Sequence, residues 1–276
     1  MNPHTRAPIA PWALVSNLWQ HRRLILQMAR REVIGRYKGS VMGILWSFLN
    51  PLFMLAVYTF VFSVVFKARW TTSPGEDKAD FAVLLFAGMI VHSLLAEVLN
   101  RAPGLILANV NYVKKVVFPL EILPVVSMCA ALFHSAISLL VLLCAIIVLD
   151  GNISLTMLLV PVVLLPYVVF VQGLAWMLAS LGVYLRDVGQ TIGIITMVLL
   201  FLSPVFFPVS SLPEELRPMM NANPLTFIIE QVREVLIWGR LPDWAGLGLY
   251  SLMALFTAWL GYAWFQRTRK GFADVL

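Results

Sequence analysis

An uncharged stretch of 26 residues, 41–66, constrains this chain most, because no Lys, Arg, Asp or Glu interrupts it. As an α-helix it would extend about 39 Å, which exceeds the ~30 Å hydrocarbon core of a bilayer. A basic cluster with a single acid stands directly before it: Arg30, Arg31, Arg36, Lys38 and Glu32. Because Lys and Arg flanks stay on the cytoplasmic side, we expect the stretch to start there and to span the membrane.

The composition extends this prediction to the whole chain. Of the 276 residues, 60% are hydrophobic and 12% are charged, whereas soluble domains are about 45–50% apolar and about 25% charged. We therefore predict an all-α integral membrane protein with six transmembrane helices. The candidate spans are residues 41–66, 81–99, 120–149, 153–185, 188–207 and 244–265.

The charges also predict an orientation, with both termini in the cytoplasm and the chain in the inner (plasma) membrane. On this topology, 14 of the 20 Lys and Arg residues lie inside, whereas the acidic residues lean outward. The net charge of +6 then reflects membrane topology and anionic lipid rather than a nucleic-acid partner. The first 40 residues contain no apolar core of the signal-peptide type, so we expect no cleaved targeting segment.

Two regions outside the spans carry helix signals. Residues 1–40 form a predicted cytoplasmic segment, in which an amphipathic helix lies on the membrane surface, and residues 41–276 form the transmembrane domain. The polar segment after the fifth span predicts two short helices that rest on the outer face. The first has a capping box, Ser211 with Glu214. The second follows Asn223 and stops at Gly239.

The sequence lacks the motifs of common enzymes and metal sites. It contains no G-x-x-x-x-G-K-[ST] phosphate loop, no H-E-x-x-H, no Cys/His metal spacing and no G-x-S-x-G. Few ionisable residues fall inside the apolar segments. We expect Glu97 to pair with Arg101 one helical turn away, Glu121 to cap a helix or reach the interface, and His92 and His134 to be buried and hydrogen-bonded.

Aromatic side chains in the first and fifth spans are candidates for a substrate path. They are Phe48, Tyr58, Phe62, Phe66, Phe201, Phe206 and Phe207. Each is more often a packing or interfacial residue than a substrate contact. Sugar rings nevertheless present apolar C–H faces that stack on aromatic rings, so an aromatic path would suit a polysaccharide.

Four segments carry a family resemblance. Residues 30–63 resemble the opening of type-2 ABC exporter permeases for polysaccharides such as O-antigen, capsule and teichoic acid; they read RREVIGRYKGSVMGILWSFLNPLFMLAVYTFVFS. Later landmarks of that family are resembled, in the same order, by NYVKKVVFPLEILP, YLRDVGQ and NPLTFIIEQVREVLIWG. The resemblance covers about residues 20–270. Family members often have Asp where Glu32 stands.

The resemblance implies a permease that is not itself an enzyme. It implies a homodimer that exports a lipid-linked polysaccharide and binds separate ATP-hydrolysing subunits, which would hold the ATP and Mg²⁺, so this chain would carry no cofactor or metal. The outer helices would form a gate. The residues implied to contact the ATP-binding subunit are Arg30, Arg31, Glu32, Arg36, Lys38, Lys114, Lys115, Arg186 and Asp187.

Two other function classes stay open at this point. An ion-coupled secondary transporter would show transport that is driven by an ion gradient and needs no ATPase partner. A membrane-embedded glycan or lipid transferase would turn over in detergent as the chain alone.

Overall fold

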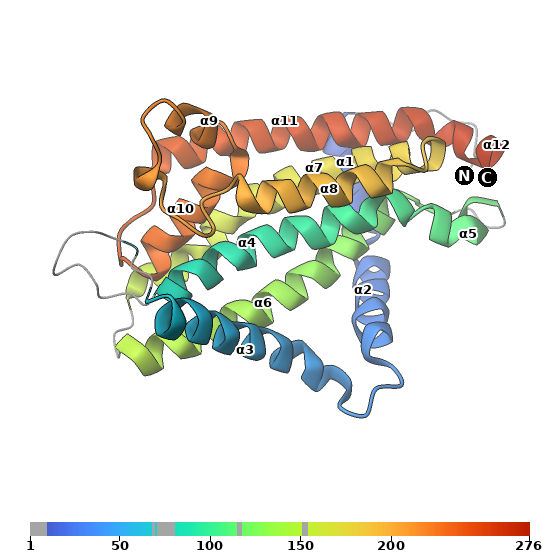
Figure 1. The fold of residues 1–276 in the computed structure, drawn as a ribbon. Coiled ribbons are helices and arrows are strands. Elements are labelled where there is room, and N and C mark those ends of the chain that lie inside the picture. Colours follow the sequence, from blue (N-terminus) through green and yellow to red (C-terminus); the bar gives the residue numbers. More distant parts are fainter. Residues whose placement is uncertain (1–9, 68–69, 71–80, 115–117, 151–153) are drawn as a thin grey trace.

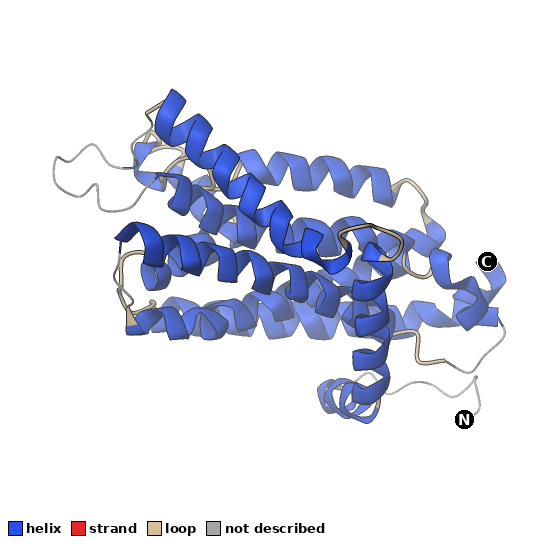
Figure 2. Cartoon of the chain, turned by 90° about the horizontal axis from the view of Figure 1, so that it is seen from below, coloured by secondary structure: helices blue, strands red, loops and turns tan. Residues whose placement is uncertain are grey.

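The computed structural model describes residues 10–67, 70, 81–114, 118–150 and 154–276, and these form helices and loops with no strand (Figure 2). The α-helices are α1 (Pro11–Gln20), α2 (Arg22–Tyr37), α3 (Trp46–Tyr58), α4 (Phe81–Arg101), α5 (Val110–Lys114), α6 (Ile122–Asp150), α7 (Val160–Tyr184), α8 (Val188–Phe201), α9 (Arg217–Asn221), α10 (Pro224–Leu236), α11 (Trp244–Thr268) and α12 (Phe272–Val275). The all-α prediction is confirmed for the described residues.

Among the described residues, five helical segments are long and apolar enough to cross a membrane: Gly43–Val65, Phe81–Gly104, Ile122–Leu149, Leu155–Tyr184 and Trp244–Val275. They correspond to five of the six predicted spans. The predicted fifth span is instead the shorter helix α8, whose 14 residues extend about 21 Å. Its helix ends at Phe201, and the chain continues through Ser203 and Pro204 without helical structure.

The long helices form a bundle with two different ends (Figure 1). One end, which we call the basic end, carries α1, α2, α5 and α12. The other, the far end, carries α9 and the beginning of α11. Helix α2 lies across the bundle direction, whereas α4, α6, α7, α8 and α11 run along it.

Helix α4 is the centre of the bundle. It packs against α3, α6, α7, α8 and α10, and 78% of its most apolar window is buried. In α3, by contrast, the buried residues are Ser47 and Leu55 alone. The first span therefore lies at the periphery of the chain, although its sequence is as apolar as that of α4.

Helices α7 and α11 are held together by close backbone contact. A Cβ atom at Gly261 of α11 would lie 2.1 Å from the carbonyl oxygen of Gly173 in α7. Similarly, a Cβ at Gly182 would lie 2.2 Å from the carbonyl oxygen of Pro103. Only glycine allows such an approach, because any side chain would collide with backbone that cannot rotate away.

The N-terminal segment differs from the single surface helix that was predicted. It forms two helices, α1 and α2, which meet at His21. One stripe of α2, formed by Ile25, Ala29 and Val33, is buried, and Ile25 and Ala29 pack with Ile122 and Val126 at the start of α6. That side of α2 thus contacts protein. Gly39, with a φ of 88°, allows the turn towards α3, as glycine tolerates the left-handed region.

The segment between α8 and α11 packs into the helix bundle, whereas it was predicted to rest on the outer face. Helix α10 begins after the N-cap Asn223, whose side-chain oxygen accepts from the Leu225 amide, and Gly239 follows its end with a φ of 64°. It packs against α4 and α7, so it does not merely rest on the surface. The predicted capping box is wrong, because the hydroxyl of Ser211 donates to the Pro208 carbonyl and α9 begins only at Arg217.

Candidate functional site

An ion-pair network at the basic end joins α2 to α4 and α6. Glu97 of α4 is at its centre: Arg36 Nη1 lies 2.5 Å from Glu97 Oε1, and His134 Nδ1 lies 2.9 Å from the same oxygen. Arg101 Nη1 is 3.9 Å from that oxygen and Arg101 also pairs with Glu32 of α2. Two residues of α2 are thus paired with two residues of α4.

The predicted pair between Glu97 and Arg101 is confirmed, but it is the longest contact of Glu97. The nearer partners come from α2 and α6, which are distant in sequence. His134 is hydrogen-bonded as predicted, but it is half-buried rather than buried. Its ring lies edge-on to that of Tyr37. His92 makes its predicted hydrogen bond too, 2.9 Å from the Thr196 carbonyl of α8.

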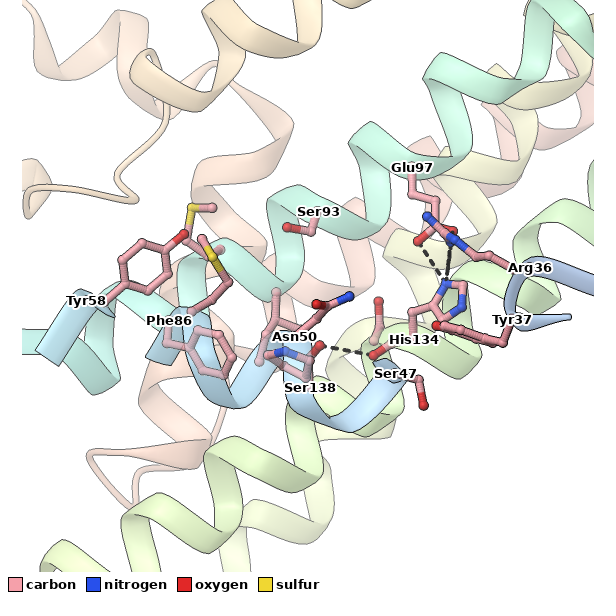
Figure 3. A pocket seen from close by; sticks show the side chains of 15 residues that line it. Arg36, Tyr37, Ser47, Asn50, Tyr58, Phe86, Ser93, Glu97, His134 and Ser138 are labelled. Carbon is pink, nitrogen blue, oxygen red and sulfur yellow. Dashed lines mark hydrogen bonds and ion pairs between the residues drawn. The ribbon is translucent and has the colours of Figure 1, made fainter. Parts of the chain in front are cut away.

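A cavity of about 280 Å³ adjoins this network between α3, α4 and α6. Figure 3 shows Arg36, Tyr37, Glu97 and His134 at one end of it and Tyr58 and Phe86 at the other. The remaining lining residues are Ser47, Asn50, Pro51, Met54, Met89, Ile90, Ser93, Ser135 and Ser138. The cavity is therefore polar at the basic end and apolar towards the far end.

The helix that forms one wall of this cavity changes geometry. After α3, residues Thr59–Val65 form a π-helix, and Pro51 lies inside α3. The Thr59 hydroxyl donates to the Leu55 carbonyl, a back-bond that tends to bend helices. Wide helical turns of this kind recur at functional sites.

An aromatic cluster at the far end brings the first and fifth predicted spans together. The Phe62 ring is 5.4 Å from that of Phe81 and 6.4 Å from that of Phe206, and Phe206 stacks on Phe201 at 5.7 Å. Phe66 joins this cluster through Phe62. Of the other predicted path residues, Tyr58 lines the cavity, Phe48 is exposed on α3, and Phe207 is half-buried after α8.

Arg233 of α10 is a central residue that the sequence reasoning missed. Its side chain is 1% exposed and donates to the carbonyls of Leu84, Pro204 and Val205. It also donates to Glu230 at 3.0 Å, and its guanidinium lies over the ring of Trp70. Burial lowers the pKa of Arg233 to about 10, which leaves it charged at neutral pH. It therefore ties α10 to α4 and to the segment after α8.

A second buried ion pair lies at the basic end. Glu121, 3% exposed, pairs with Arg269 at 2.8 Å and accepts from Asn17 of α1. Arg269 also donates to the Phe118 carbonyl. Glu121 thus joins the chain's two terminal helical regions, a role beyond the capping or interfacial one that was predicted.

Those residues implied to contact an ATP-binding subunit that the structure describes lie at the basic end, on three elements. Arg30, Arg31 and Lys38 are exposed on and just after α2, and Lys114 is exposed at the end of α5. Arg186 and Asp187 are exposed between α7 and α8. Glu32 and Arg36 are engaged in the ion-pair network. Lys115 lies outside the described residues.

The described residues contain no group of three or more His, Cys, Asp or Glu side chains placed to hold a metal ion. Their free cysteines are Cys129 and Cys144. The candidate site thus combines ion pairs between helices, a cavity that is polar at one end and apolar at the other, and stacked aromatic rings. These features can bind a molecule and can rearrange when helices move.

Comparison with known proteins gives a consistent set of relatives. Residues 23–237 match the family model for the ABC-2 type transporter. The O-antigen export system permease protein RfbA of Myxococcus xanthus is 27% identical over 263 residues, 95% of this chain and 98% of that protein. A protein of the same description from Klebsiella pneumoniae is 23% identical, over 92% of this chain and 95% of its own length. The polysialic acid transport protein KpsM of Escherichia coli is 25% identical, over 87% and 91%.

Proposed function

Because the chain belongs to the ABC-2 type transporter family, we propose that it is the permease subunit of an ATP-driven exporter that moves a polysaccharide across the inner membrane. The observation that carries this proposal is the similarity to O-antigen export permeases over 92–95% of the chain. The two other function classes, an ion-coupled carrier and a membrane-embedded transferase, have no observation of comparable specificity in their favour.

We propose a six-pass topology with both termini in the cytoplasm. In it, α8 together with the segment that follows makes the fifth crossing, although α8 alone is short. This topology is supported by the placement of α1 and α12 at the same end of the bundle (Figure 1) and by the excess of Lys and Arg in the predicted inner parts. The basic end then faces the cytoplasm.

The energy source is a separate ATP-binding subunit that docks at the basic end and holds the ATP and Mg²⁺. The absence of a phosphate loop in this chain supports that division of labour. Lys114 and Arg186 are exposed there on different elements and are our candidates for the docking surface. ATP binding would favour one permease conformation through different contacts at this surface in the two states.

The conduit lies between two copies of this chain. The cavity between α3, α4 and α6 measures only about 280 Å³, which is too small for a polymer to pass, since even the pockets of drug-sized ligands measure about 300–1,000 Å³. Outside the side that holds the buried Ser47 and Leu55, helix α3 exposes apolar residues, among them Phe53 and Val57. Phe66 and Phe201 of the aromatic cluster are exposed too. Facing copies of α3 and α8 would bring these rings towards a glycan that carries a lipid anchor.

Removing this chain from a cell that displays the polysaccharide tests the proposal. We expect the polymer to disappear from the surface and to accumulate inside, because synthesis continues while export has stopped. Surface and intracellular polysaccharide are measured by antibody or lectin binding before and after permeabilisation. Unchanged surface display without this chain would contradict the proposed function.

Complementation with charge-reversal variants extends the same experiment to the partner. The double variant Lys114→Glu and Arg186→Glu is expected to restore roughly tenfold less surface polysaccharide at normal membrane abundance, since it places acids on the docking surface. The matched control is Arg240→Glu, an exposed cation that follows α10, which should restore export fully. If the double variant and the control restored export equally, Lys114 and Arg186 would not belong to the proposed contact.

A further inference from the structure

Residues 269–276, which we call the tail segment, follow α11 at the basic end. A short turn over Arg269–Gly271 leads into α12 (Figure 1). The Phe272 side chain of α12 is 0% exposed, and its ring lies 5.5 Å from that of Phe265 and 6.0 Å from that of Tyr184. A helix of a single turn is not stable by itself, so this burial shows that tertiary contacts hold the tail segment in place.

The tail segment packs against α5, which carries Lys114. Within the described residues, and apart from the turn just before it, α5 packs chiefly against α12. Phe272 belongs to the same buried cluster as Ile106, and Tyr112 and Val113 of α5 pack on that cluster. With only five residues, α5 is also too short to be stable by itself. Its position therefore depends on the surface that Phe272 and its neighbours provide.

Arg269 connects the tail segment to the start of α6. Its guanidinium lies 2.8 Å from the Glu121 carboxylate and donates to the Phe118 carbonyl at 3.0 Å. The Phe118 ring in turn stacks on that of Tyr112, with 4.3 Å between the ring centroids. The tail segment thus holds α5 by two contacts, the Phe272 ring and the Phe118 ring that Arg269 anchors.

The same segment is fastened to the end of α7, which leads to Arg186. The Tyr184 hydroxyl of α7 donates to the Thr268 carbonyl at 2.7 Å. The backbone also comes close to this hydroxyl at Gly271, where an added Cβ would lie 2.6 Å from it. Helix α12 therefore contacts both α5 and α7, and these two elements position the candidate docking residues.

We propose that Phe272 is a positioning residue for the coupling of this chain to the ATP-binding subunit. Because its ring is fully buried, it acts through α5 and not by touching the subunit. The tail segment fixes α5 relative to the end of α7, so that the subunit meets Lys114 and Arg186 in one arrangement. This inference rests on the proposed docking at the basic end and adds the residue that sets its geometry.

Phe272→Ala is expected to weaken docking without changing the docked complex. Without the ring, α5 adopts its binding arrangement in only a fraction of the molecules, and the apparent Kd rises by the inverse of that fraction. We expect a fraction of roughly one tenth, so the subunit concentration at half-saturation should rise roughly tenfold. The amount of subunit bound per folded chain at saturation should stay the same, because binding selects the competent arrangement.

The experiment titrates the full chain in lipid nanodiscs with the purified ATP-binding subunit, below the melting temperature of every variant. Leu123→Ala is the matched control for loss of packing alone, because Leu123 is 4% exposed in the same buried cluster but lies on α6. It should lower the melting temperature and leave the half-saturation concentration at the wild-type value. Wild-type half-saturation for Phe272→Ala would overturn the proposal. So would an equal rise in Phe272→Ala and Leu123→Ala.

Gly271→Ala keeps the test decisive where Phe272→Ala does not fold. The added Cβ collides with the Tyr184 hydroxyl and should displace α12 from α7, which raises the half-saturation concentration. Tyr184→Phe removes that oxygen, and the nearest remaining ring atom lies 3.5 Å from the Cβ. The double variant should therefore bind as Tyr184→Phe alone does. Wild-type binding by Gly271→Ala, or a double variant weaker than Tyr184→Phe, would contradict the proposal.

The double variant Lys114→Glu and Arg186→Glu, titrated in the same way, separates this inference from the proposed docking. Weaker binding by that variant together with wild-type binding by Phe272→Ala would overturn only the positioning role. Wild-type binding by the variant of Lys114 and Arg186 would contradict the docking surface and, with it, this inference.

Discussion

Replacing Arg233 with methionine is expected to destabilise the folded chain by about 3–5 kcal/mol, the usual result of breaking a buried charged network from one side. The substitution leaves the carbonyls of Leu84, Pro204 and Val205 without their donor. At about 2–4 °C per kcal/mol for a domain of this size, the melting temperature should fall by roughly 6–20 °C. The fall in melting temperature is measured by heating the purified protein in detergent and recording the loss of its monodisperse elution peak.

Arg240→Met is the matched control for Arg233→Met. Arg240 is also close to a glutamate, at 3.7 Å from Glu234, but its side chain is 69% exposed. Exposed pairs contribute about 0–1 kcal/mol, so this variant should unfold close to the wild-type temperature. Equal melting temperatures for Arg233→Met and the wild type would show that α10 is not held by this arginine.

Replacing Gly261 with alanine is expected to disrupt the packing of α7 against α11. The added Cβ would lie 2.1 Å from the carbonyl oxygen of Gly173, and a backbone atom cannot avoid it by rotating. Overpacking typically costs about 1–3 kcal/mol when side chains can adjust; here two helices must separate, so we expect the upper end of that range or more. The folded yield and melting temperature of the purified variant give the measurement.

Gly248→Ala, on the same helix, provides the control for Gly261→Ala. A Cβ at Gly248 meets nothing within 4 Å, so alanine should be neutral or stabilise the helix by up to about 1 kcal/mol. If Gly261→Ala and Gly248→Ala had the same melting temperature, the close contact between α7 and α11 would not contribute to stability.

The spans could be predicted from the sequence because hydrophobicity is a local property of a segment. The exception is α8, where the helix ends at Phe201 rather than near residue 207. A proline disfavours helical geometry in the residue before it, and Pro204 follows Ser203 here. The Asn223 side chain then binds the Leu202 carbonyl and the Ser203 hydroxyl, which holds the turn from a distant position in the chain.

Burial of α10 could not be predicted from its own residues. The polar residues of α10, Arg233 among them, are typical of a surface helix. The periodicity of its apolar residues correctly predicted where the helix lies in the sequence, but not that it is buried against α4 and α7. The carbonyls that satisfy Arg233 come from α4 and from the segment after α8. Only the tertiary structure supplies those partners.

The same distinction applies to the candidate site. The pair of Glu97 with Arg101 follows from a four-residue spacing on one helix. Arg36 and His134, the nearer partners of Glu97, come from two other helices, and no local signal connects them. The contact of Phe62 with Phe206 likewise joins two spans that are distant in the sequence and was not predicted. That these aromatic residues contact a glycan stays a prediction.

Reconstitution in proteoliposomes tests the proposed permease role most directly. The purified chain is compared with and without its ATP-binding subunit, while ATP hydrolysis and polysaccharide translocation are measured together. We predict that the chain alone does neither, and that translocation appears only with the partner, ATP and Mg²⁺. Hydrolysis of ATP, or translocation driven by an ion gradient, by the chain alone would contradict the assignment.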